Sequence, residues 1–107
     1  MGFPRVVITG MGVVSSIGND VESFAQGLSG GKSGIGAITR YDTSLLDVKI
    51  AGEVKGFTFP VGLNIPKKEQ RRFDLATQYA LAAMYESVSM AKIGEEINRE
   101  KVSVILG

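Results

Sequence analysis

The chain of 107 residues has the length of one ordinary domain, and its 12 Lys and Arg residues against 11 Asp and Glu give a formal net charge of +1. A chain this close to neutral has no overall field to attract phosphate or anionic lipid, so general binding to nucleic acid or membrane is not expected. It contains no cysteine and no histidine, which excludes a disulfide, a thiolate nucleophile and the commonest general base and metal ligand. We therefore expect neither a metal nor a cofactor.

The first predicted element is a short β-branched run at residues 6–9, which Gly10 stops. A continuous apolar run of this length predicts a strand that is buried on both faces of a parallel or mixed sheet. With Arg5 before it, the run also has the outline of a secretion signal. We reject that interpretation because glycine and hydroxyl residues interrupt the run, no small-residue cleavage pattern follows, and a bilayer span needs about 20 apolar residues.

A helix is predicted to follow, with Asn19 or Asp20 as its N-cap and apolar side chains at helical spacing. A Gly-Gly pair then ends it. The next segment, residues 29–36, contains four glycines and predicts a connector rich in turns. Over residues 41–59 an irregular alternation of apolar residues favours an extended stretch, consistent with a hairpin at the periphery.

The strongest predicted element is a long helix over residues 66–93, with Pro66 at its first position and Asp74 as the cap of a second helix within it. Small and larger apolar residues cover much of its circumference after residue 75, which is typical of a helix buried in a larger body. Gly94 predicts the end of this helix, and residues 102–106 predict a second continuous strand. Strand, helix, irregular extension, long helix and strand together indicate an α/β layer whose sheet lacks its other strands.

The sequence TGMGVVS at residues 9–15 comes close to the G-x-G-x-x-G loop that binds dinucleotide phosphates. Ser15 stands where the third glycine would allow close helix packing, and the predicted helix begins several residues late. Its N-terminal amides therefore do not directly follow the turn. We favour a structural interpretation, in which the glycines make a tight bend between strand and loop.

Four cations lie within six residues in the sequence KKEQRR at residues 67–72. Helical i, i+3 and i+4 relations would place Lys68, Arg71 and Arg72 on one face. Taken alone, this charge pattern favours a solvated helix face, with Asp74 and the glutamate inside the cluster as ionic partners.

Residues 5–19, RVVITGMGVVSSIGN, resemble the opening of the β-ketoacyl-acyl carrier protein synthases, and especially of the type II elongation enzymes. Further blocks occur in the order and spacing of that family, namely VES at 21–23, KSGI at 32–35, YDTS at 41–44, AGEV at 51–54 and KKEQRRFD at 67–74. The resemblance therefore spans essentially the whole chain. The chain departs from the family at Ser16, where proline is usual, and at Phe24, where tryptophan is common, and these departures leave the subfamily open.

The resemblance implies a thiolase-like fold of two related α/β halves, usually assembled as a homodimer, with residues 1–107 as the N-terminal portion of the first half. The implied activity is that of an acyltransferase of fatty acid elongation, in which an acyl thioester condenses with malonyl-acyl carrier protein by decarboxylative Claisen chemistry. That chemistry needs a cysteine nucleophile, two histidines and an oxyanion hole. We expect these groups and the family's active-site lysine beyond residue 107. No catalytic residue is therefore assigned here, and the segment alone is expected to be inactive.

The resemblance also gives the cationic cluster a role. Lys68, Arg71 and Arg72 match positions that, in this family, form the basic patch that docks the acidic recognition helix of acyl carrier protein. Charge complementarity of this kind governs mainly encounter and orientation. The expected partners are acyl carrier protein, the remainder of the synthase and a second subunit, and the expected location is the cytoplasm.

Three alternatives stay open at this point: a non-catalytic partner subunit of the chain-length-factor type, a polyketide ketosynthase, and a free-standing α/β binding module. A downstream cysteine with two histidines would support an enzyme, whereas a substituted nucleophile would support the partner subunit. Hydrogen exchange would distinguish the binding module, because a self-sufficient module should protect the amides of residues 102–106.

Overall fold

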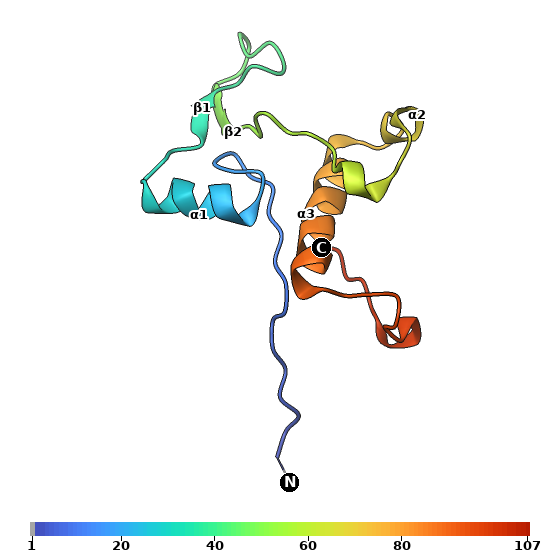
Figure 1. Cartoon of the computed structure of the whole chain (residues 1–107). Helices are drawn as coiled ribbons and strands as arrows, with labels where there is room; N and C mark the ends of the chain where they lie inside the picture. The colour runs from blue at the N-terminus through green and yellow to red at the C-terminus, as the bar shows by residue number, and fades with distance from the viewer. Residues whose placement is uncertain (1) are drawn as a thin grey trace.

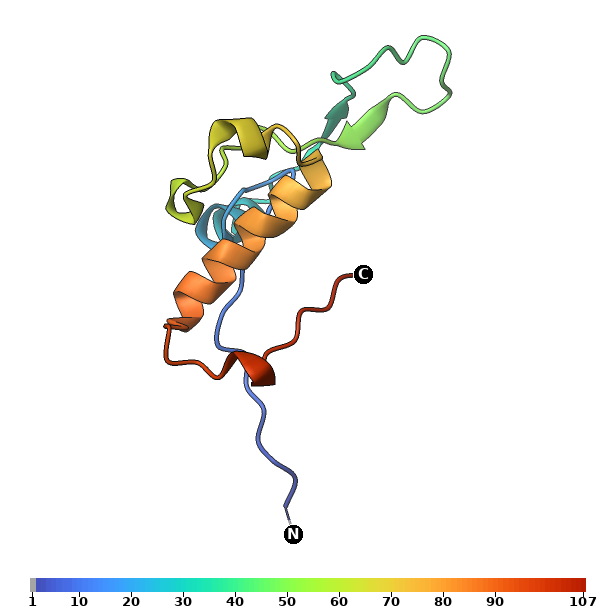
Figure 2. The same cartoon turned by 90° about the vertical axis from the view of Figure 1, so that its right-hand side faces the viewer.

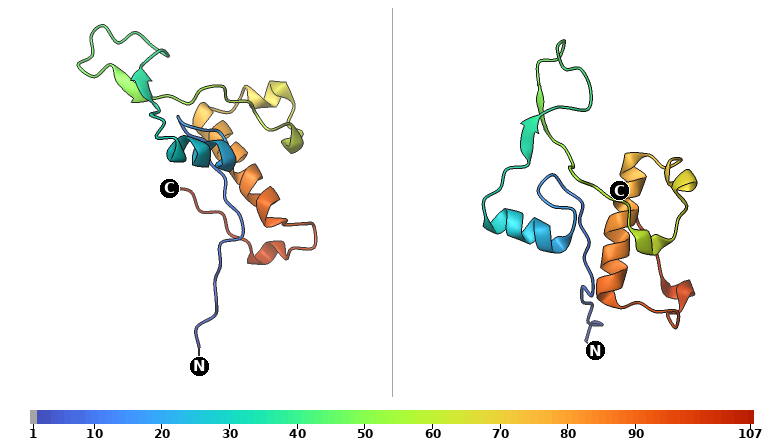
Figure 3. Two further views of the ribbon diagram at one scale, coloured as in Figure 1. Left: turned by 60° about the vertical axis from the view of Figure 1, so that its left-hand side comes forward. Right: turned by 45° about the horizontal axis from the view of Figure 1, so that its top comes forward.

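The computed structural model describes residues 2–107, whose elements are joined by long irregular segments (Figure 1). In chain order the elements are α1 (Val21–Ser29), β1 (Ile35–Ala37), β2 (Ile50–Gly52), the 3-10 turn η1 (Val61–Leu63), α2 (Lys67–Gln70), α3 (Leu75–Ala91) and the 3-10 turn η2 (Arg99–Lys101). The segment that leads into α1 runs between α1 and α3, and β1 and β2 form an arm that projects away from the helices (Figures 1 and 3).

The first helix confirms its sequence prediction. Asp20 is the N-cap of α1, and its side chain accepts a hydrogen bond from the backbone N–H of Ser23 at 2.7 Å. The Ser23 side chain lies 3.3 Å from the backbone N–H of Asp20, which completes a reciprocal capping box. The helix ends where the Gly-Gly pair predicts, with Gly30 as its C-cap and Gly31 at a φ of 65°.

The predicted peripheral hairpin exists, but it includes one strand that the sequence did not indicate. β1 pairs with β2 in an antiparallel register that sets Ile35 opposite Gly52 and Ala37 opposite Ile50. β1 lies at the end of the glycine-rich segment, which was expected to be a connector without an element of its own. Composition could not show this strand because a three-residue strand is defined by its hydrogen-bonded neighbour.

The predicted long helix is divided in two. α2 ends after one turn, Asp74 caps α3 by accepting from the backbone N–H of Thr77 at 2.7 Å, and Pro66 is the N-cap of α2, one position before the helix begins. The end of α3 also differs from the prediction, because Lys92 adopts the left-handed conformation at a φ of 54° two residues before Gly94. Its N–H and that of the next residue bond to carbonyls of the last turn, the pattern of a Schellman motif without glycine.

Neither predicted outer strand pairs with a neighbour within residues 2–107, so both predictions are corrected to unpaired segments. Apolar side chains stand in solvent along both segments: Val6 is 90% exposed, Ile8 85% and Ile105 90%. The reason is physical. An isolated run of β-branched residues forms no strand until another strand satisfies its backbone N–H and C=O groups.

The whole structure is correspondingly open (Figure 2). Its radius of gyration is 17.4 Å, against about 13 Å for a compact domain of this length. Its accessible surface of 9049 Å² exceeds the roughly 5,800 Å² of a folded monomer of this mass. No hydrophobic side chain in the described residues is fully buried. These elements therefore form an incomplete α/β assembly whose apolar faces are largely uncovered.

None of the helices in residues 2–107 combines the length and the apolar character that a membrane span requires.

Candidate functional site

The cationic cluster occupies one turn between η1 and α3. We call residues 67–72 the basic turn, and it comprises α2 together with Arg71, the C-cap of that helix, and Arg72. The side chains of Lys68, Arg71 and Arg72 are all exposed. The structure therefore brings the three sequence-predicted residues into one solvent-facing turn.

The backbone of the basic turn tightens after Arg71, which changes the predicted geometry. The N–H of Arg71 donates to the carbonyl of Lys67 at 3.2 Å, as in an α-helix, but the N–H of Arg72 donates to the carbonyl of Glu69 at 2.9 Å. An i to i−3 bond belongs to a turn of about three residues. The backbone is α-helical from Lys68 to Arg71, as the expected i, i+3 relation requires. It is no longer α-helical at Arg72, so the expected i, i+4 relation of Lys68 and Arg72 does not apply.

Two glutamines hold the ends of this segment. Nε2 of Gln70 donates to the carbonyl of Ile65 at 2.6 Å, and Nε2 of Gln78 on α3 donates to the carbonyls of Gln70 and Phe73 at 3.3 and 3.1 Å. A hollow of about 210 Å³ lies among Lys67, Gln70, Arg71 and Gln78. Sequence reasoning missed both glutamines.

The acid next to the cluster has a different function from the one expected. Asp74 was a candidate ionic partner for the cations, but its carboxylate caps α3. Hydrogen bonding by the side chain and the backbone N–H of Thr77 lowers the pKa of Asp74 below its ordinary value of 3.8. The carboxylate thus stabilises the start of α3 in its charged form.

The glycine motif near the N-terminus has a structural role, though not the one predicted. A Cβ at Gly12 would collide with the carbonyl oxygen of Ala83, and a Cβ at Gly10 would collide with that of Ser87. Neither glycine needs a positive φ. Both glycines are required because the backbone of this segment lies directly against the small residues Ala83, Ser87 and Ala91 of α3. A side chain has no room there. The interpretation as a tight bend is therefore corrected to one of close helix contact.

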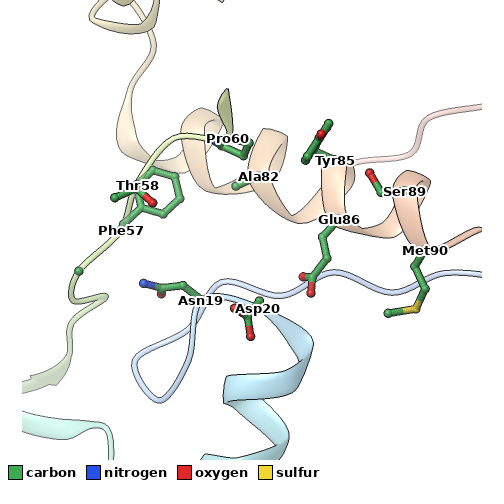
Figure 4. Close-up of a pocket in the computed structure, with 11 residues that line it drawn as sticks. Asn19, Asp20, Phe57, Thr58, Pro60, Ala82, Tyr85, Glu86, Ser89 and Met90 are labelled. Atoms are coloured by element: carbon green, nitrogen blue, oxygen red, sulfur yellow. The ribbon is translucent and has the colours of Figure 1, made fainter. Parts of the chain in front are cut away.

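A second polar site, which the sequence analysis missed, links the same segment to α3. The carboxylate of Glu86 accepts from the backbone N–H of Val13 at 3.0 Å and from that of Val21 at 2.7 Å. Figure 4 shows Glu86 reaching from α3 toward the start of α1, beside an open cleft of about 600 Å³. The sequence did contain a signal for this role, because Glu86 is the only charged residue in the otherwise uncharged helix α3.

The base of the β1–β2 arm is fixed by charged side chains. Glu53 accepts from the backbone N–H groups of Thr39 and Arg40 at 3.0 and 3.2 Å, and from the Thr39 hydroxyl at 2.8 Å. Bonds from the Thr39 hydroxyl and backbone lower the pKa of Glu53. The Arg40 guanidinium in turn donates to the Tyr79 hydroxyl at 2.9 Å and to the carbonyl of Val54 at 3.1 Å. Glu53 thereby ties the two sides of the arm together, and Arg40 links the arm to α3 through Tyr79.

The model of the β-ketoacyl synthase N-terminal domain matches residues 4–107. The chain belongs to the β-ketoacyl synthase family. This confirms the resemblance found in the ordered sequence blocks.

Relatives and a solved structure agree with this assignment. The chain is 44% identical over 104 residues to 3-oxoacyl-[acyl-carrier-protein] synthase 2 of Staphylococcus aureus, and 38% identical to the protein of the same name from Synechocystis. Each match covers 96% of this chain but only 25% and 24% of the relative. The structure titled the ishigamide ketosynthase/chain length factor superposes with a TM-score of 0.69 at 39% identity, over 84% of this chain and 22% of the other. The chain thus spans about a quarter of the length of the relatives it matches.

Proposed function

We propose that this chain is the N-terminal portion of a 3-oxoacyl-acyl carrier protein synthase, in which it supplies scaffold and a docking surface for the carrier protein. Its similarity to two synthases of that name supports the proposal. The reaction would be a decarboxylative Claisen condensation, run in the cytoplasm by a homodimer. Because the sequence has neither cysteine nor histidine, we propose that the nucleophile and the decarboxylating groups lie in other parts of the synthase and that this segment alone is inactive.

The observation that carries the docking proposal is the exposure of Lys68, Arg71 and Arg72 in one turn. Side chains on a solvated surface can meet a partner without rearrangement of the fold, and three cations attract an acidic surface from a distance. The next acidic residue along the sequence is Asp74, and its carboxylate already accepts a hydrogen bond from the backbone N–H of Thr77.

A second candidate function has support from the solved structure. That structure is titled a ketosynthase/chain length factor. The full-length protein to which this chain would belong, called here its parent, would then be the partner subunit of a ketosynthase pair. The two candidates differ in chemistry, since a partner subunit needs the fold and no nucleophile. A parent sequence with a cysteine nucleophile and two histidines supports the synthase, and a parent with that cysteine replaced supports the partner subunit.

The docking proposal is tested by charge reversal in the parent synthase. The variant carries Lys68→Glu, Arg71→Glu and Arg72→Glu, and we expect it to raise KM for acyl carrier protein substrates at least about tenfold and to leave small pantetheine thioesters nearly unaffected. A variant with Lys32→Glu, Lys49→Glu and Lys101→Glu is the matched control, because it changes the net charge equally at exposed positions elsewhere.

Equal losses with carrier-protein and pantetheine substrates would contradict the docking proposal, because they would indicate a general defect of the enzyme. Equal effects of the test and control variants would also contradict it, since net charge alone would then explain the change in KM.

A further inference from the structure

The basic turn cannot hold its own conformation. α2 has four residues, whereas isolated helices shorter than about 12–15 residues are marginal in water. The turn after it, from Gln70 to Phe73, carries two of the three docking cations. Its geometry therefore depends on groups outside the helix.

Gln78 supplies the outside support. Its Nε2 atom bonds to the carbonyls of Gln70 and Phe73, the two residues that flank Arg71 and Arg72. A primary amide has two N–H donors, so both are used on this one turn. Gln78 itself stands in the first turn of α3, where its backbone N–H donates to the carbonyl of Asp74 at 3.0 Å, and its side chain is partly buried.

Gln70 acts at the opposite end of the segment. Its side chain crosses back to the carbonyl of Ile65, just before α2 begins. The chain from residue 65 to residue 73 is thus closed at its entry by one glutamine and tied to α3 at its exit by the other. Neither glutamine carries a charge, so neither adds to the attraction of an acidic partner.

We propose that Gln78 is a positioning residue for carrier-protein docking, holding the turn so that Arg71 and Arg72 are presented in one conformation. This inference rests on the proposed function. A surface that is ordered before binding avoids an entropic cost on association. Loss of the Gln78 amide would then weaken docking although every cation remains.

The test replaces Gln78 with methionine, which has a similar length and helix propensity but no N–H donor. Gln26→Met in α1 is the matched control, because the Gln26 side chain is exposed and far in sequence from the basic turn. In the parent synthase we expect Gln78→Met to speed amide exchange of Arg72 and Phe73 at least about tenfold, because it removes two side-chain hydrogen bonds from the turn. We expect KM for carrier-protein substrates to rise about threefold to tenfold on the same basis, with kcat and the pantetheine substrate unchanged.

The possible results separate this inference from the docking proposal. Faster exchange with an unchanged carrier-protein KM would overturn the positioning role, while the charge-reversal result would still decide the docking. Unchanged exchange would overturn the inference directly, because the two bonds would not be holding the turn. If charge reversal has no effect on KM, the docking proposal and this role fall together. Gln78→Leu, which also removes the donor and adds no charge, repeats the comparison should the methionine variant fold poorly.

Discussion

The segment before α1 and the segment after η2 are both apolar and both lie beside α3, where Val104 and Leu106 line a hollow with that helix, but within residues 2–107 only the first is bonded to it. Residues 10–13 lie against α3 through glycine contacts and a bond to Glu86. Residues 102–106 remain unpaired, with Ile105 90% exposed. Residues 102–106 carry more large apolar side chains than residues 10–13, so apolar character does not explain why the latter are the better fixed. Specific contacts explain it. Small residues of α3 and the carboxylate of Glu86 receive residues 10–13, whereas residues 102–106 have no strand partner within residues 2–107.

Hydrogen exchange on the 107-residue chain tests this comparison with the largest expected effect. Amides in the middle of α3 should exchange about one hundredfold more slowly than those of residues 103–106, because the α3 amides donate within the helix whereas the N–H groups of residues 103–106 have no acceptor in residues 2–107. Amide-resolved exchange by NMR measures the contrast. Equal protection in the two segments would show that residues 102–106 have found a partner in this chain.

A side chain at Gly12 should disrupt the contact that places the N-terminal segment on α3. Gly12→Val inserts a branched side chain where the carbonyl of Ala83 already lies, and we expect a loss of about 3 kcal/mol or more in the free energy of unfolding of the parent protein. Gly36→Val is the control, since a Cβ there meets nothing within 4 Å. Urea unfolding of both variants measures the difference, and similar midpoints would refute the close contact.

Removal of one acceptor from Glu86 should have a smaller effect. Glu86→Gln leaves one backbone N–H, of Val13 or Val21, facing an amide donor, with an expected cost of about 1–3 kcal/mol. Faster exchange of the amide that loses its acceptor should accompany it. Glu95→Gln is the control, because it makes the same chemical change at an exposed position. An equal loss of stability in that variant would contradict the stabilising role of the Glu86 hydrogen bonds.

The smallest effect is expected at the cap of α3. Asp74→Ala should lower the free energy of unfolding by less than Glu86→Gln does, whereas Asp74→Asn should keep most of the capping energy. The pKa of Asp74 is lowered by folding, so its contribution is complete above the ordinary value of 3.8 and is lost as the pH falls through the lower folded value.

Urea midpoints measured between pH 2 and pH 6 test this dependence. The difference between Asp74→Asn and the unchanged protein should alter only at the acid end of that range. A difference that stays constant down to the lowest pH would contradict the capping role of the charged carboxylate.

Local signals in the sequence predicted what local interactions determine. Asp20 and Asp74 were identifiable as caps because a cap bonds to a residue three positions ahead. The basic turn was visible as a charge cluster, and the family from its ordered blocks. In contrast, β1, the role of Glu86 and the support from Gln78 depend on residues brought together by folding. The left-handed Lys92 was missed because glycine is the usual residue there and Gly94 stood two residues later.

The bonds made by Glu86 also constrain the order in which this region can form during synthesis. They join residues 73 and 65 positions apart in the chain, whereas the Asp20 cap joins residues three apart. Contacts that close long loops form later than local ones. The Asp20 cap can therefore form as soon as residues 20–23 leave the ribosome, but the bonds to α3 form only after residue 86 has been made. Until then the apolar segment before α1 has no helix on which to dock.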